Sequence, residues 1–191
     1  MRRRLAVLVC AAALLGAARP QPETRLLFIG NSLTQANNLP ELVVSLAKAA
    51  GKRAGAEMVA TGGFGLEDHW NQGDAQKAIA RGGWSVVILQ QGPSLDRKQD
   101  FAGVSRSYAA AANDVHGLLF TAGDAWRAAW ARDASLALYG PDNFHPSPMG
   151  SYLAALVITR KIFDVSPVGL PAPAFAPGVA RLLQDVAANL K

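Results

Sequence analysis

The stretch LLFIGNSL, residues 26–33, decides the fold that we expect for this chain. Its first four residues form an apolar run, which is typical of a β-strand buried on both faces. The run breaks at Gly30, and Asn31 and Ser32 follow in a turn. A segment with helical spacing of apolar residues comes next, and Pro40 suits its first turn. Because α/β proteins place their sites where a strand ends and a helix begins, Ser32 is a candidate functional residue.

Ser32 alone has two interpretations, since it either satisfies backbone donors of the turn or acts as a nucleophile. The segment DNFHP, residues 142–146, offers the partners that a nucleophile needs. A neutral histidine is the usual base for a hydroxyl, and a carboxylate fixes its tautomer and stabilises the imidazolium. His145 follows Asp142 by three positions, so one turn brings them into contact. We therefore predict Ser32 as nucleophile, His145 as base and Asp142 as the group that orients the base.

These two segments together resemble the SGNH (GDSL-type) hydrolase family of serine esterases and lipases. The family's first block reads Gly-Asp-Ser or Gly-Asn-Ser, as at residues 30–32, and its last block supplies both acid and base, as at residues 142–146. Gly62 and Gly63 resemble the second block, whose glycine N–H helps to form the oxyanion hole. The resemblance spans roughly residues 26 to 163. It implies hydrolysis of acyl esters through an acyl-enzyme, without a metal or another cofactor.

The resemblance also implies an oxyanion hole that includes the N–H groups of Ser32 and Gly63. The third block of the family supplies an asparagine after the third strand, but this chain has QQGPS at residues 90–94. Gln91 or Ser94 can substitute for it; if neither reaches the oxyanion, the hole has only backbone donors and catalysis is slower. We favour Gln91 because its side-chain amide can donate to an oxyanion.

Four further residues are candidates for the substrate cleft, namely Asn31, His69, Trp70 and Ser94. An ordinary surface position is the alternative for His69 and Trp70. Two acidic residues precede His69, which suggests a metal site. Adjacent side chains rarely point at one centre, however, and no further ligands are spaced for it, so we expect no metal.

The order of segments predicts a three-layer α/β/α domain with a short parallel sheet, as in the flavodoxin-like SGNH hydrolase fold. A five-stranded member of the family would place a helix and a fourth apolar strand after the buried strand at residues 84–90. Residues 101–113 are instead polar and rich in alanine. We therefore expect four strands, the last at residues 118–121. The chain is either a naturally compact variant or a truncated one that folds poorly, and the sequence leaves both open.

The C-terminal part of the chain has helical character. Asp124 suits the N-cap of a helix at residues 125–131. Ser147 and Pro148 predict the start of a helix that runs to about residue 163. Four prolines mark an extended connector at residues 165–177, and a terminal helix follows. We expect residues 25–191 to form a single domain.

The N-terminus, residues 1–18, reads as a signal peptide. Three arginines precede a short apolar run and small residues, which predicts cleavage after Ala18 and export to the periplasm or outside. The run is too short for a typical membrane span, so we expect no stable anchor after cleavage. The only cysteine of the chain, Cys10, lies in this segment, so the mature chain has no disulfide.

The charge of the chain argues against nucleic acid as a partner. The whole chain has 19 Lys and Arg against 14 Asp and Glu, and cleavage leaves 16 against 14. No basic run remains, so nucleic-acid binding has little support. We expect an exported serine esterase whose substrate is an acylated carbohydrate or another small ester. The alternative is an exported binding protein on the same scaffold, inactive because of the altered third block and the shortened core.

Overall fold

The centre of the fold is a small parallel sheet. The computed structural model describes residues 23–91 and 101–190, and within them the sheet has the strands β1 (Thr24–Gly30), β2 (Ala54–Ala60) and β3 (Val86–Leu89). Their order is β2-β1-β3, which agrees with the first three strands of a flavodoxin-like sheet. The apolar run at residues 26–29 forms the middle strand and is buried on both faces, as its sequence predicts.

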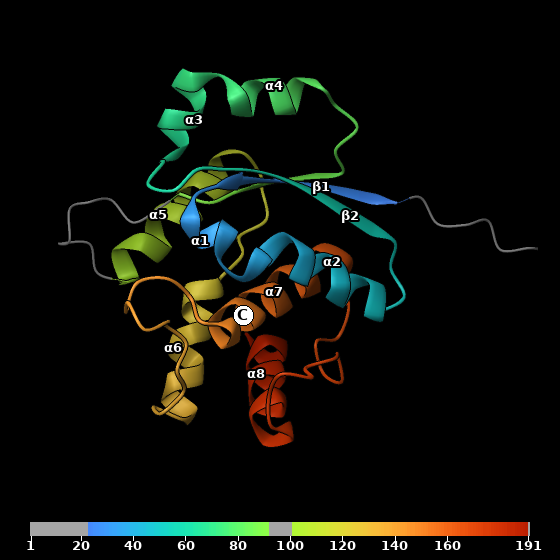
Figure 1. Cartoon of the computed structure of the whole chain (residues 1–191), viewed down its shortest axis with the longest axis vertical. Helices are drawn as coiled ribbons and strands as arrows, with labels where there is room; N and C mark the ends of the chain where they lie inside the picture. The colour runs from blue at the N-terminus through green and yellow to red at the C-terminus, as the bar shows by residue number, and fades with distance from the viewer. Residues whose placement is uncertain (1–22, 92–100, 191) are drawn as a thin grey trace, which may run out of the picture.

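Helices cover both faces of the sheet (Figure 1). On one face lie α3 (Leu66–Gln72) and α4 (Asp74–Ala80), and α4 packs on the β1 side chains that point toward it. On the other face lie α2 (Leu39–Ala49) and α7 (Pro148–Phe163). This is a layered α/β arrangement, as the order of segments predicts.

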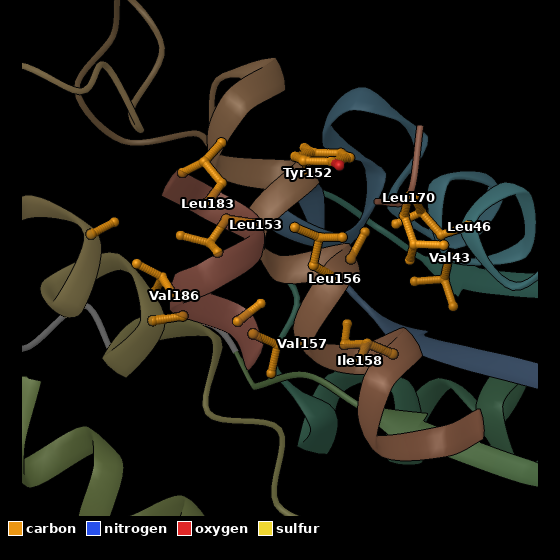
Figure 2. Close-up of a cluster of buried hydrophobic side chains, with 14 of the residues drawn as sticks. Val43, Leu46, Tyr152, Leu153, Leu156, Val157, Ile158, Leu170, Leu183 and Val186 are labelled. Atoms are coloured by element: carbon orange, nitrogen blue, oxygen red, sulfur yellow. The ribbon is translucent and has the colours of Figure 1, made fainter. Parts of the chain in front are cut away.

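The larger core lies between helices on the α7 side of the sheet. In Figure 2, Leu153, Leu156 and Val157 of α7 lie between the α2 residues and the residues of α8 (Pro177–Asn189). α6 (Ala122–Arg132) adds Ala125 and Ala129 to the same cluster. The predicted helix from residue 148 to about 163 and the C-terminal helix are therefore confirmed, and the connector between them, residues 165–176, contains no helix or strand.

The remaining elements are short or peripheral. Directly after β1 come α1 (Ser32–Gln35) and the 3₁₀ helix η1 (Ala36–Asn38). Beyond β3, α5 (Phe101–Asp114) occupies the part of the chain that is polar and rich in alanine.

The predicted fourth strand is wrong. Residues 118–121 form no strand, and the sheet has three strands within the described residues. These residues connect α5 to α6, where Leu118 is 60% exposed and Phe120 packs against the helical core. The following helix begins at Ala122 with Thr121 at the N-cap position, so Asp124 lies in the first turn and is not the cap. A short apolar run alone could not distinguish a strand from such a connection.

The predicted signal peptide, residues 1–18, lies outside the described residues. In the part of the chain that the structure describes, none of the helices combines the length and the apolar character needed to cross a bilayer.

Candidate functional site

The nucleophile turn, residues 30–34, begins where β1 ends. Ser32 is the first residue of α1, and Asn31 is the N-cap, whose Oδ1 accepts a hydrogen bond from the N–H of Leu33 at 3.1 Å. Asn31 also donates from Nδ2 to the carbonyl of Phe64 at 2.9 Å and is only 5% exposed. Ser32 itself is partly buried. Asn31 thus holds the turn in place, and its predicted position as a lining residue of the cleft is wrong.

Gly30 must be a glycine for steric reasons. A Cβ atom at this position would overlap the Thr34 hydroxyl and would lie 2.7 Å from Oε1 of Gln90. The close approach of these two side chains to the backbone explains why the strand ends in a glycine.

The acid–base turn, residues 139–146, brings Asp142 and His145 together as the sequence predicts. Asp142 Oδ2 lies 2.5 Å from His145 Nδ1, while Oδ1 accepts hydrogen bonds from the backbone N–H groups of Phe144 and His145 at 3.1 and 3.0 Å. The hydrogen bond from His145, with these backbone donors, lowers the pKa of Asp142 to about 2. Asn143 has a φ of +53°, in the left-handed region that asparagine tolerates in turns.

This geometry assigns the tautomer of His145. A carboxylate can only accept, so Nδ1 carries the proton and Nε2 of the neutral ring has a free lone pair. The described residues give Nε2 no hydrogen-bond partner, and the side chain is 39% exposed. His145 is therefore equipped to take a proton from a hydroxyl that approaches from solvent.

Helix α7 anchors the acid–base turn. Ser147, its N-cap, accepts a hydrogen bond from the N–H of Gly150 at 3.1 Å and donates to the carbonyl of Ala137 at 2.6 Å. Trp126 of α6 donates to the carbonyl of Gly150 at 3.1 Å. The base thus lies directly before a buried helix, which limits its movement.

Asn37 joins the two turns. It lies five positions after Ser32, and its Nδ2 donates to the carbonyl of Pro146 and to the hydroxyl of Ser151, both at 2.9 Å. Pro146 directly follows His145. Asn37 and Asn38 both have left-handed φ values, +53° and +51°. Two neighbouring residues in this region are uncommon and often occur at functional sites, so the strained bend places the N-terminal turn against the C-terminal one.

The loop at residues 61–64 lies beside the nucleophile turn. Thr61 donates to the carbonyl of Gly30 at 3.3 Å, and the carbonyl of Phe64 accepts from Asn31. Between them Gly63 has a φ of +80°, and apart from its chain neighbours no described residue has an atom within 4 Å of the position that a Cβ would take. Its N–H takes part in none of the hydrogen bonds between described residues. Beside the candidate nucleophile, this loop therefore has open space and the N–H of Gly63, which makes no hydrogen bond to the described residues.

Part of Gln91 makes structural hydrogen bonds. Its Oε1 accepts from the N–H of Leu66, at the start of α3, at 2.8 Å. Its backbone N–H and carbonyl both bond the hydroxyl of Tyr108, at 2.8 and 2.6 Å, and burial raises the pKa of that tyrosine. The side-chain N–H groups of Gln91 remain the candidate donors. Ser94, the other predicted substitute, lies outside the described residues.

His69 does not line a cleft. The residue is fully buried, with Nε2 2.7 Å from the carbonyl of Gly30 and Nδ1 3.1 Å from each oxygen of Asp74. Trp70 is 64% exposed. Successive side chains of a helix point about 100° apart, so α3 turns one of the two inward and the other to the surface. The predicted cleft position of His69 is wrong because the end of the middle strand supplies a buried acceptor, the Gly30 carbonyl, for its ring.

Sequence reasoning missed two residues of this region, Asn37 and Gln90. The pair Asn37-Asn38 carries a signal that could have been used, because asparagine is enriched at left-handed positions. Nothing in the sequence indicates that the side chain of Gln90, rather than that of Gln91, reaches the nucleophile turn. Among the described residues no three His, Cys, Asp or Glu side chains are grouped to hold a metal ion.

Comparisons with known proteins bear on the fold. No family model matches the sequence, and no curated protein matches it. The structure is similar to a crystal structure of a DUF4886 family protein from Bacteroides uniformis, with a TM-score of 0.69 and 16% sequence identity. The similarity covers 88% of this chain and 94% of that one. At this identity the likeness concerns the fold alone.

Proposed function

We propose that the protein is a serine ester hydrolase of SGNH type. The main support for the proposal is the pair of hydrogen bonds that Asn37 donates to Pro146 and Ser151. These bonds hold the segment of Ser32 against the segment of His145. The Asp142–His145 pair supports the proposal, since it has the tautomer and the free Nε2 that a general base requires.

In the proposed reaction Ser32 Oγ attacks the ester carbonyl and gives its proton to Nε2 of His145. Asp142 stabilises the resulting imidazolium. The bond to the alcohol then breaks, and the leaving oxygen takes the proton from His145. Water adds to the acyl-enzyme by the same route, so that an acid and a free Ser32 are formed.

The negative oxygen of each intermediate needs donors. The proposal assigns this role to the N–H groups of Ser32 and Gly63, with the side-chain amide of Gln91 as a third. The open space beside Gly63 supports its assignment, because a backbone donor without a covering side chain can approach a ligand closely.

Hydrolysis of p-nitrophenyl acetate tests the proposal. Ser32→Ala should abolish turnover and leave the circular dichroism spectrum unchanged, because only a partly buried hydroxyl is removed. Ser166→Ala, at an exposed position in the connector between α7 and α8, is a matched control and should keep the wild-type rate. Equal turnover by wild type and Ser32→Ala contradicts the mechanism.

A binding protein on the same scaffold is the second candidate, and one observation favours it. The amide oxygen of Gln91 is committed to Leu66 of α3, and the third-block asparagine of the family is absent. A fluorophosphonate probe separates the two candidates, because an activated serine displaces fluoride and an idle serine does not react. No labelling of the wild-type protein would favour the binding protein.

The proposed setting is extracytoplasmic. The predicted signal peptide at residues 1–18 supports export, and an acylated carbohydrate or another small ester fits an exported esterase. Acetylated and longer-chain p-nitrophenyl esters, compared at equal concentration, will define the acyl group that the site accepts.

A further inference from the structure

Gln90 holds the nucleophile turn from the neighbouring strand. It lies directly after β3, and its Oε1 accepts two hydrogen bonds, from the backbone N–H of Asn31 at 3.1 Å and from the hydroxyl of Thr34 at 2.9 Å. These two donors flank Ser32 in the sequence. One oxygen therefore holds the turn on both sides of the candidate nucleophile, by the backbone N–H of Asn31 before it and the side chain of Thr34 after it.

The surroundings of Gln90 leave its oxygen little freedom. A Cβ on Gly30 would come within 2.7 Å of Oε1, so the side chain lies tightly over the turn, and Thr34 is 2% exposed. The orientation of the amide follows from Asn31, since a backbone N–H needs an acceptor and only the oxygen of the amide is one.

The amide nitrogen of Gln90 indicates the role of this residue. Nε2 is buried and has no hydrogen-bond partner among the residues that the structure describes. A buried donor without a partner is destabilising, so a glutamine placed here for stability alone would be a poor choice. The oxygen is the part of the side chain that the turn uses.

We infer that Gln90 is a positioning residue for Ser32, acting through its two hydrogen bonds to the nucleophile turn. The inference rests on the proposed function. It assigns Gln90 no contact with substrate. Its role is to keep the Ser32 hydroxyl oriented for attack, so loss of the oxygen should slow the chemical step and leave substrate binding unchanged.

The test compares three variants in p-nitrophenyl acetate hydrolysis. Gln90→Met keeps the length of the side chain but lacks the acceptor, and we expect kcat to fall about tenfold or more with KM unchanged. Gln90→Glu keeps an acceptor and should restore most of kcat. Gln184→Met is the matched control, because Gln184 is a buried glutamine of α8 with hydrogen bonds to Gly169, Tyr152 and Leu170.

A merely structural role would make Gln90→Met behave like Gln184→Met, with a lower melting temperature and an unchanged kcat for the folded protein. That result overturns the inference. If Gln90→Met does not fold, Thr34→Val decides, since it removes one of the two donors. A fall in kcat of about threefold would then support the inference, and an unchanged kcat would overturn it.

The fluorophosphonate probe separates this inference from the proposed function. A wild-type protein that is not labelled contradicts the proposed function, and the inference falls with it. A labelled wild type with equally fast labelling of Gln90→Met contradicts the inference alone.

Discussion

The described residues form two histidine–aspartate pairs, which share one contact but differ in exposure and in the surroundings of the second ring nitrogen. In the acid–base turn, His145 and Asp142 lie at the surface, with side chains 39% and 51% exposed. Beneath the nucleophile turn, His69 is 1% exposed and bonds Asp74, which is 33% exposed. In each pair Nδ1 faces the carboxylate.

The second ring nitrogen distinguishes the pairs. Nε2 of His69 lies 2.7 Å from the carbonyl of Gly30, so both nitrogens of this ring are engaged. Nε2 of His145 has no partner among the described residues. A histidine with both nitrogens engaged holds the backbone in place, whereas one with a free nitrogen can move a proton. The comparison supports a structural role for the buried pair and the proposed role in proton transfer for the exposed pair.

His145→Asn gives the largest expected effect. It removes the only free ring nitrogen of the two pairs, so kcat for p-nitrophenyl acetate should fall by about 10³-fold, within the range seen for loss of a general base. His116→Asn, at an exposed position after α5 with a φ of +51°, is the matched control and should keep the wild-type rate. If His145→Asn retains more than half of the activity, His145 is not the base and the two pairs do not differ as we infer.

Asp142→Asn should have the next largest effect. The amide no longer selects the tautomer with the proton on Nδ1 and no longer stabilises the imidazolium, so kcat should fall by about 10²-fold or more while KM changes little. Steady-state kinetics measure both constants. If KM rises and kcat does not change, Asp142 contributes to binding and the assigned role is wrong.

Replacement of the buried histidine should affect stability first. His69→Leu removes the shorter of the two hydrogen bonds to the Gly30 carbonyl and leaves Asp74 without its ring partner, so it should lower the free energy of unfolding by about 2 kcal/mol, measured by urea denaturation. Activity per folded molecule should fall much less than in His145→Asn. Unchanged stability of His69→Leu, or activity as low as that of His145→Asn, would contradict the structural role that we give to His69.

The smallest expected effect is a dependence of stability on pH. The hydrogen bond from His145, followed by those from the backbone N–H groups of Phe144 and His145, lowers the pKa of Asp142 from 3.8 to about 2. Because the folded value is the lower one, the associated stabilisation is complete above the unfolded pKa and is lost as the pH falls toward 2.

Asp142→Asn lacks this stabilisation at every pH. The difference in Tm between wild type and variant should therefore be constant above about pH 5 and shrink as the pH falls through 3.8 toward 2. Thermal unfolding followed by circular dichroism measures it. A difference that stays the same down to about pH 2 would show that the carboxylate gains nothing from the turn.

Local patterns were sufficient for the elements that decide the fold. The run at residues 26–29 is apolar, unbroken and followed by a glycine turn, a combination that favours a buried strand, and the dipeptide Ser147-Pro148 marks the start of α7. The spacing of Asp142 and His145 predicts a contact within one turn, which the structure contains. These features depend on neighbours in the sequence, and tertiary context did not override them.

The sequence was insufficient where distant segments decide. His69 is buried because the Gly30 carbonyl accepts from it, and no local pattern reports a partner 39 positions away. Residues 118–121 look like a strand but lie between two helices, with Leu118 exposed. The contact of Asn37 with Pro146 is equally invisible in the sequence, although it unites the candidate site.

The central claim is that His145 activates Ser32, and locating the covalent adduct tests it most directly. The wild-type protein is treated with a fluorophosphonate, digested and analysed by peptide mass spectrometry. We predict one adduct, on the peptide that contains Ser32, formed far more slowly in His145→Asn than in His116→Asn. Failure of the wild type to react, attachment to another serine, or equal rates in the two histidine variants would contradict it.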